Sequence, residues 1–557
     1  MRFRSLFKVW LILGSVLLLS CSYKKPAVFW YASGGTPELF ALSRDADRGI
    51  LSSKAGKLEY GFSAPLKITD EYSLELSYQW NGEGEAQAVL DTGDLSWELP
   101  RDLSFLDMEK IQEAAGQAMA GSSLIRYTVP LASGNLEKII LRLTKGEGSK
   151  DQSLVIRSIA LIPRWYGFRV EENQSALCLS PFVYSRDHTL VIDPPVPFRI
   201  REPELKIGFG AAGSFIAAAN EQNTPGYFMI EGEAPQGLFR IPAFFFSSAS
   251  YPLEIKGPEI ESAELLTGKP FSTEPIPSDP GMILRWPRDH WRDERYELFS
   301  WAAFPSILIF DMADYDVQDR FLKRLAFFAE KAGFRGRLAP DSEIAGLHGW
   351  NAHDYRSVTL AAFFDLAEKT GFPLLPEEKE LESILVNYKI ILRNSNGIVP
   401  GAGALISITR ESPDYLRSLF MVHEGFHGLY FIDEDFRNFC RQRWENFTGV
   451  PRAFILSYFE YQAYDTKDTD LVINEFMAHI LQQPASQADR YFGETLAGRI
   501  DASPWRRTVL PPKDESTESW PLLAGAFRAE AEIFSRYVNQ RWGLAAGRVR
   551  KIRIDLN

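Results

Sequence analysis

The spacing of apolar residues changes once along this chain, at a proline-rich stretch, and that change constrains the fold more than any other feature. Before it, apolar and polar residues alternate, as at 72–80, which is the pattern of a half-buried strand. Beyond it, apolar residues recur at helical spacing, as at 413–432. The prolines of residues 267–280 indicate a linker between the two parts. The sequence therefore predicts a multidomain protein, with an all-β amino-terminal region followed by a mainly helical one.

The β-rich region is expected to form two domains, at residues 31–165 and 166–266. Strands repeated at this spacing favour an antiparallel sandwich, with a short helix expected at 108–120. The apolar run at 153–163 is similar to the last strand of galactose-binding-like jelly rolls, which implies a jelly-roll-like sandwich for the first domain. Aromatic residues of these domains could stack on sugars, although packing in a core explains them more simply.

Residues 281–557 are expected to form one mainly helical α+β domain. An apolar strand is predicted at 307–310 and another at 401–410, just before the longest helical pattern. The predicted helices cover residues 317–332, 356–370, 377–391, 413–432, 470–483 and 520–541.

The amino-terminal segment has the pattern of an export signal. Residues 1–20 carry three basic residues and no acid, and their apolar run at 9–19 is too short to span a bilayer comfortably. The Leu-Leu-Ser-Cys sequence that ends at Cys21 is similar to the bacterial lipobox. The resemblance implies lipidation of Cys21, a tether over residues 21–30 and a place in the bacterial cell envelope, with the outer membrane or the cell surface favoured. The membrane would be contacted through this lipid alone.

The overall charge argues against a nucleic-acid partner. The chain has 61 Lys and Arg against 73 Asp and Glu, a net charge of −12, and such an acidic body repels phosphate backbones. Basic residues at 548–553 alternate with apolar ones, which is typical of a terminal strand with one solvated face. Cys178 and Cys440 fall in different predicted domains, so we expect two buried thiols rather than a disulfide framework.

The strongest chemical signal is the sequence His423-Glu424-Gly-Phe-His427. Histidines at i and i+4 lie on one face of a helix, where both imidazoles can bind a single zinc ion. Glu424 would then face a water on that ion and could take its proton. Ser412 and Pro413 are placed to cap the helix and to occupy its first turn. The structural alternative is a core helix with two histidines on one side.

A zinc ion in such a site needs a third protein ligand, and Glu475 is the best candidate. Asn474, Glu475 and Ala478 match the Asn-Glu-x-x-Ala pattern of the second active-site helix in gluzincin metallopeptidases, so the two motifs together resemble thermolysin-like and aminopeptidase-like enzymes. The resemblance covers about 80 residues. It implies a zincin-like catalytic domain, zinc bound by both motif histidines and Glu475, and Glu424 as the general base.

Two features depart from the gluzincin pattern. Glu475 follows His427 by 48 residues, a longer separation than in familiar members. Four residues after Glu475, where those enzymes often have an aspartate, the chain has His479, which could orient a ligand or stabilise an oxyanion. Asp433, ten residues after His423, is a rival third ligand, but the glycine that such zincins need is replaced by Tyr430.

Other residues near the motif remain open as contributors. The strand at 404–408 could bind the substrate backbone as a sheet edge, although an interior strand is equally consistent with its sequence. The segment 348–355, with His348, His353 and Asp354, either forms a structural hydrogen-bond network or lines the cleft. Candidates for oxyanion stabilisation between the two motifs are Tyr458, Tyr461 and Tyr464.

These patterns favour a lipid-anchored zinc metallopeptidase that acts as a monomer on a peptide or protein substrate, which could be glycosylated. An alternative from another class is a surface lipoprotein that binds glycan or a host protein and whose zincin domain is inactive or structural. A third is hydrolysis of a non-peptide bond, because the motif defines the metal chemistry better than the substrate.

Overall fold

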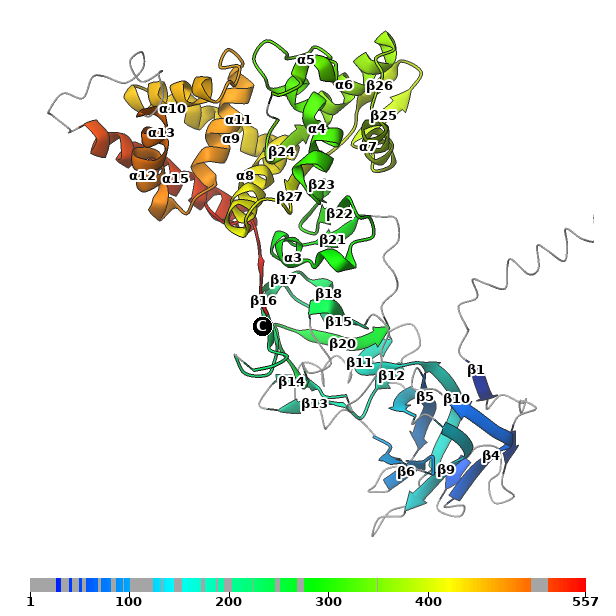
Figure 1. Ribbon diagram of the computed structural model, residues 1–557. Coiled ribbons are helices and arrows are strands. Elements are labelled where there is room, and N and C mark those ends of the chain that lie inside the picture. Colours follow the sequence, from blue (N-terminus) through cyan, green and yellow to red (C-terminus); the bar gives the residue numbers. More distant parts are fainter. Residues whose placement is uncertain are drawn as a thin grey trace, which may run out of the picture. The chain divides into compact units, whose positions relative to one another are not determined.

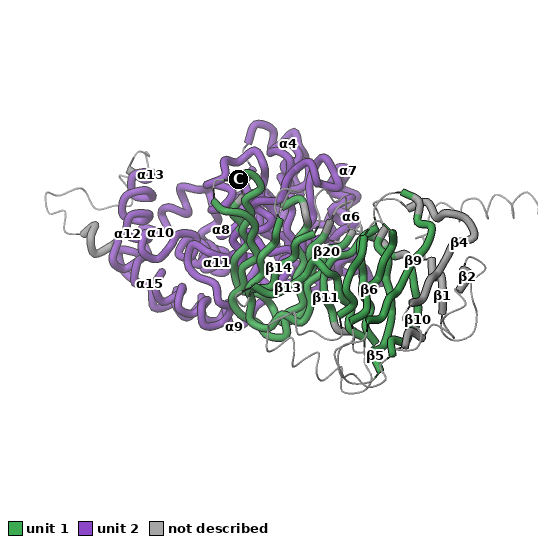
Figure 2. The backbone as a smooth tube through the Cα atoms, turned by 90° about the horizontal axis from the view of Figure 1, so that it is seen from below, with its two compact units in different colours: residues 1–270, 554–557 green, residues 271–553 purple. Residues whose placement is uncertain are grey.

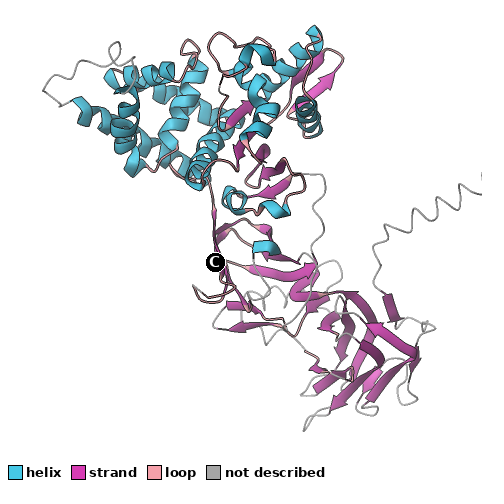
Figure 3. Cartoon of the chain, in the orientation of Figure 1, coloured by secondary structure: helices cyan, strands magenta, loops and turns pink. Residues whose placement is uncertain are grey.

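The computed structural model divides the chain into two compact units, residues 1–270 with 554–557 and residues 271–553 (Figure 2). Strands make up most of the first unit and helices most of the second (Figure 3), which confirms the predicted multidomain chain with a β-rich first half and a helical carboxyl-terminal region. The residues described are 27–31, 40–42, 50–52, 57–68, 72–81, 87–93, 95–100, 124–131, 134–144, 153–171, 176–186, 189–194, 203–222, 224–245, 251–267, 275–347, 349–501 and 519–556.

The described strands of the first unit form three sheets (Figure 1). The largest has ten strands, with β3 (Ile50–Ser52) beside β10 and the others in the order β1 (Ala27–Tyr31), β10 (Ser153–Pro163), β5 (Tyr72–Asn81), β8 (Leu124–Pro130), β12 (Ala176–Leu179), β11 (Trp165–Glu171), β20 (Ile260–Thr267), β15 (Pro203–Phe209) and β18 (Gly237–Pro242). The second has the order β2 (Phe40–Leu42), β4 (Lys57–Ile68), β9 (Gly134–Thr144), β6 (Gln87–Asp91) and β7 (Ser96–Glu98). The third has the order β13 (Val183–Arg186), β14 (Thr189–Ile192), β19 (Leu253–Lys256), β16 (Gly213–Ala219), β17 (Phe228–Ala234) and β28 (Ile552–Leu556), and a short 3-10 helix, η2, covers Ala243–Phe245.

The strands expected at 72–80 and 153–163 are present as β5 and β10. Strand β5 is interior to its sheet, and Ser73 and Ser77 are buried along with Leu74, Leu76 and Tyr78, so this strand is more than half buried. The ten-stranded sheet takes strands from both sides of residue 165, because β8 pairs in parallel with β12. The expected helix at 108–120 lies outside the described residues.

The second unit is built around a five-stranded sheet. Its order is β21 (Ile276–Ser278), β22 (Tyr296–Trp301), β23 (Phe304–Met312), β27 (Ala404–Thr409) and β24 (His353–Arg356). Strand β27 lies between β23 and β24, so the strand expected at 404–408 is an interior one. The edge strand next to β27 is β24, which runs antiparallel to it, and β21 forms the other edge.

Helices cover both faces of this sheet, because its strands present apolar residues on both sides. Leu308, Phe310 and Tyr355 share one core with helices α4 (Tyr315–Ala329), α6 (Ser357–Thr370) and α7 (Pro376–Asn387). Helix α8 (Asp414–Ile432) lies on the opposite face, where Gly428 is so near the sheet that a β-carbon there would be 3.1 Å from Ile307 and 3.6 Å from Ile406.

The helices expected near 356–370, 377–391, 413–432, 470–483 and 520–541 are all present. Among the described residues, no helix has the length and apolarity needed to cross a bilayer. The further elements of this unit are α3 (Pro280–Arg285), η3 (Arg288–His290), α5 (Asp341–Ile344), the hairpin β25 (Ile391–Asn394) and β26 (Gly397–Pro400), α9 (Glu434–Asn446), α10 (Val450–Tyr461), α11 (Thr469–Leu481), η4 (Ala485–Gln487), α12 (Ala488–Arg490), the π-helix η5 (Tyr491–Leu496), α13 (Ala497–Asp501) and α15 (Ser519–Trp542).

Asp279 joins the start of the second unit to its last residues. Its carboxylate caps α3 by accepting from the backbone N–H of Gly281 at 2.8 Å, and it also accepts from Lys551 at 2.9 Å and Ile552 at 3.1 Å. Burial raises the pKa of Asp279 to about 6, although these three donors act against the shift. One side chain thus holds two ends of the unit together.

Candidate metal centre

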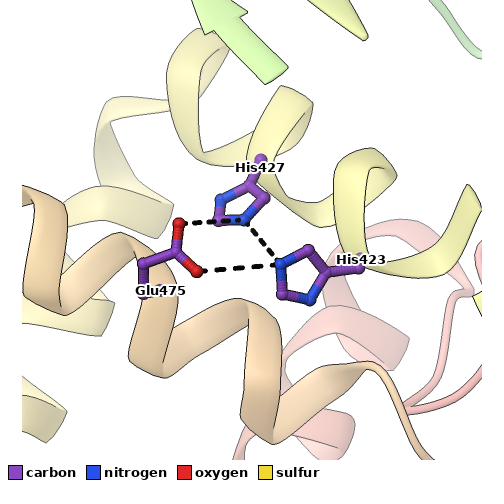
Figure 4. Close-up of side chains that lie close together, drawn as sticks. All are labelled: His423, His427 and Glu475. Atoms are coloured by element: carbon purple, nitrogen blue, oxygen red, sulfur yellow. Dashed lines mark hydrogen bonds and ion pairs between the residues drawn. The ribbon is translucent and has the colours of Figure 1, made fainter. Parts of the chain in front are cut away.

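Helix α8 places His423 and His427 on one face, as their spacing predicts. Their Nε2 atoms lie 3.1 Å apart (Figure 4), and His427 is completely buried. The predicted cap is wrong by one residue. Pro413 occupies the cap position with no side-chain hydrogen bond, so Ser412 lies outside the helix and bonds instead to Tyr315.

Helix α11 brings Glu475 to the same point. The helix begins after Asp468, whose carboxylate accepts from the N–H groups of Asp470 and Leu471, and this cap fixes the phase of the helix. Glu475 Oε2 lies 3.7 Å from His423 Nε2, and its Oε1 lies 3.7 Å from His427 Nε2 (Figure 4). Three donor groups from two helices therefore converge, although Glu475 follows His427 by 48 residues in the sequence.

The separations suit a small divalent ion. A tetrahedral zinc site with bonds of about 2.0–2.1 Å places neighbouring ligand atoms about 3.3–3.4 Å apart, and the three distances here are 3.1, 3.7 and 3.7 Å. Among the described residues, no hydrogen-bond partner is found for the buried Oε2 atom of Glu475. Buried polar atoms normally have a partner, so the residues present fit a zinc ion.

The rival ligand, Asp433, lies elsewhere. Its carboxylate caps α9 by accepting from Phe436 N at 2.7 Å, and it forms an ion pair with Arg541 at 2.7 Å. It belongs to neither of the two groups of potential metal ligands in the described part of the chain. The position of Asp433 is thus explained by helix capping.

The second such group joins Glu424 to a residue of the edge strand. Asp354, Glu424 and His427 have ligand atoms within 4.8 Å of one another, and Asp354 Oδ2 lies 3.8 Å from His427 Nδ1. Strand register places Asp354 there, because it pairs with Ile406, whose side chain faces α8. Of segment 348–355, Asp354 therefore lies beside the motif residues. His353 faces the other way, 2.8 Å from the hydroxyl of Tyr355.

Four carboxyl groups are concentrated around the histidines. Burial raises the pKa of Glu424 well above its ordinary value, and the nearby charges of Asp354, Glu475 and Glu330 raise it further. Burial raises the pKa of Glu330 for the same reason, and that of Asp354 despite the opposing effect of His427. Burial alone would raise the pKa of Glu475, but His427 and His423 lower it to about 2. A divalent cation would offset the repulsion among these groups.

His479 lies beside the three-residue cluster, with its ring centre 5.1 Å from that of His423 and 5.5 Å from that of Tyr458. Burial, together with the neighbouring imidazoles, lowers the pKa of His479 to about 3, so its ring is neutral near pH 7. Its Nδ1 is 3.0 Å from the hydroxyl of Tyr491 and 3.1 Å from Nε2 of Gln482.

The three tyrosines between the two motifs differ in their contacts and burial. Tyr458 is buried beside His479, and its hydroxyl accepts from Arg499 at 3.1 Å and from Gln462 at 2.8 Å. Tyr464 stacks on Trp350, and Tyr461 is 39% exposed. Of these three candidates in the described structure, Tyr458 is therefore the one that contacts His479.

Three further predictions concern cysteines and His348. Cys178 and Cys440 are both buried, and they belong to different units. Cys21, with the whole export signal, and His348 lie outside the described residues.

Several residues at the site escaped the sequence analysis, among them Gln482 and Glu330. Gln482 lies seven residues after Glu475, on the same helix face, and that spacing is a signal that could have found it. Glu330 follows the last residue of α4, and nothing in its local sequence marks it.

Comparison with known proteins does not assign the chain to a family. No family model matches the chain, and no curated protein matches it. One solved structure, described as "Cell entry of botulinum neurotoxin type C is dependent upon interaction with two ganglioside molecules", is similar over 45% of this chain and 90% of its own, with 8% sequence identity and a TM-score of 0.13. A likeness this low carries no information on fold or function.

Proposed function

We propose that this protein is a lipid-anchored zinc metallopeptidase outside the cytoplasm, with zinc held by His423, His427 and Glu475. The observation that carries the proposal is the convergence of three donor groups, 3.1–3.7 Å apart, from two helices, with His427 and Glu475 buried. The peptidase class comes from the sequence resemblance to gluzincins, and the lipid anchor comes from the lipobox-like sequence at Cys21. The substrate would be a peptide or protein.

A bound zinc ion would act as a Lewis acid and lower the pKa of water at the site. Glu424 would accept the proton of the attacking water and later give it to the leaving amine. Asp354, within 4.8 Å of Glu424 in the same ligand group, would hold that carboxyl in place. His479 would donate a hydrogen bond to the oxyanion of the tetrahedral intermediate.

The substrate backbone would extend along β24 rather than along β27, because β24 is the edge of the sheet. Its antiparallel pairing with β27 leaves its other side as the place where a further strand could add. Asp354 of the same strand lies beside His427, so a peptide bound at this edge would pass close to the ligands.

The first test measures metal content in the soluble form that begins after Cys21. The wild type should bind about one zinc ion per chain and Glu475→Ala should lose most of it. Asp433→Ala is the matched control, because it also removes one carboxylate, but one that caps α9 and lies outside the cluster, and it should keep its zinc. A wild type that binds no zinc after reconstitution would contradict the proposal and favour a binding lipoprotein.

The second test separates metal binding from catalysis. Glu424→Gln should retain zinc and lose cleavage of a peptide library by a factor of about 10²–10⁴. Full activity in this variant would show that the mechanism is wrong. Zinc binding by the wild type without cleavage of any peptide would indicate hydrolysis of another bond or a structural metal.

A further inference from the structure

Gln482 contacts two histidines of the site at once. It follows the last residue of α11, where its backbone N–H bonds to Ala478 at 2.8 Å, and its side chain is buried. Its Oε1 lies 3.0 Å from Nδ1 of His423, and its Nε2 lies 3.1 Å from Nδ1 of His479. One amide group therefore lies between a predicted metal ligand and the histidine beside it.

The chemistry of an amide makes these two contacts opposite in kind. A carbonyl oxygen only accepts, so His423 must carry its proton on Nδ1. A neutral imidazole has one proton, and its Nε2 is then left with a lone pair. That Nε2 is the atom 3.1 Å from His427 Nε2 and 3.7 Å from Glu475 Oε2. The glutamine thus selects the tautomer in which His423 can bind a metal ion.

The amide nitrogen has the reverse effect on His479. An NH₂ group only donates, so Nδ1 of His479 must be the unprotonated atom, and the ring proton is on Nε2. The Tyr491 hydroxyl, 3.0 Å from the same Nδ1, can rotate to donate as well. His479 is therefore held as a donor through Nε2.

We propose that Gln482 is a positioning residue that sets both tautomers, a metal-binding one in His423 and a proton-donating one in His479. The proposal rests on the proposed function for the meaning of each role, but the tautomers themselves do not depend on it. A partner of this kind, which orients a metal ligand from behind, typically changes metal affinity by 10- to 100-fold.

The direct test is nitrogen-15 NMR of histidine-labelled, zinc-free protein near pH 8, which distinguishes the two neutral tautomers. In the wild type we expect Nδ1–H for His423 and Nε2–H for His479, each assigned by its own substitution. The opposite tautomer at either ring would overturn the proposal without touching the metallopeptidase assignment.

Two variants separate the two contacts. Gln482→Glu keeps an acceptor for His423 but removes the donor to His479, so His479 should switch to Nδ1–H while His423 stays unchanged. Gln482→Met has a similar length and neither polar group, so it should release the His423 ring and raise the zinc dissociation constant by about 10- to 100-fold, while His479 keeps the Tyr491 hydroxyl as a partner. Gln462→Met is the control, because Gln462 bonds to Tyr458 and contacts neither imidazole by a hydrogen bond in the described structure; it should leave both tautomers and the zinc affinity unchanged.

The outcomes are separable. If His479 remains Nε2–H in Gln482→Glu, or if zinc affinity in Gln482→Met stays within threefold of the wild type, Gln482 does not position these rings. If the wild type binds no zinc but shows the expected tautomers and the expected switch, the proposed function fails and the assignment of Gln482 stands.

Discussion

Asp279 offers the sharpest test of how the second unit is held together. Its Oδ1 accepts from two buried N–H groups, those of Gly281 and Ile552, while Oδ2 accepts from the partly buried N–H of Lys551. Asp279→Asn keeps one acceptor oxygen, which can serve the first two donors, whereas Asp279→Ala keeps none. Leaving a buried donor without an acceptor costs about 1–3 kcal/mol, so the alanine variant should be less stable than the asparagine variant by about 2–6 kcal/mol.

Hydrogen exchange followed by mass spectrometry measures this difference where it arises. Peptides that cover 279–283 and 549–553 should lose protection in Asp279→Ala relative to Asp279→Asn by roughly a thousandfold, which corresponds to about 4 kcal/mol. Neither side chain titrates, so the comparison does not depend on pH. A difference below 1 kcal/mol would show that these hydrogen bonds do not fasten the two ends.

The wild type adds a pH dependence of defined sign. The pKa of Asp279 rises from 3.8 to about 6 on folding. Between these values the opened state has lost its proton and the folded state keeps it, so the opening free energy falls as pH rises. The loss is about 3 kcal/mol, from roughly two pKa units at about 1.4 kcal/mol each. The difference between wild type and Asp279→Asn should change by this amount from pH 3.8 to 6 and stay constant above it; a flat difference would refute the argument.

Three further changes test packing, charge and thiol burial. Gly428→Ala places a methyl group 3.1 Å from Ile307 and should lower the free energy of unfolding, measured by thermal unfolding, by about 1–2 kcal/mol. The control Gly525→Ala, whose methyl group would have no atom within 4 Å, should raise it by about 0.5–1 kcal/mol. Equal shifts in the two variants would contradict the close packing at Gly428. Arg417→Ala leaves the fully buried Asp311 without its 2.8 Å partner and should cost about 3–5 kcal/mol by the same assay, so a loss under 1 kcal/mol would show that Arg410 suffices. Burial raises the pKa of the Cys440 thiol, so iodoacetamide should label it only after unfolding, and rapid labelling of the native protein would place it at the surface.

Local patterns were sufficient for the helices of the site. The i and i+4 histidines and the Asp468 cap determine which faces of α8 and α11 carry His423 and Glu475, and both are properties of short segments. Asp354 could be noticed but not assigned, because its orientation depends on its pairing with Ile406 of β27, 52 residues later in the sequence. Whether residues 404–408 form an edge or an interior strand was uncertain for the same reason. The periodicity of a sequence does not distinguish an interior strand from an edge strand.

The register of β24 has a consequence for how this chain can vary. His353 and Asp354 are neighbours whose side chains point to opposite faces of the sheet, so a slip of one residue could replace the carboxylate beside His427 with the imidazole of His353. An insertion or deletion in the loop before β24 is therefore tolerable only if the loop absorbs it before residue 353. In an alignment of related chains, we therefore expect insertions and deletions in the loop just after α5. We expect none within β24, from His353 to Arg356.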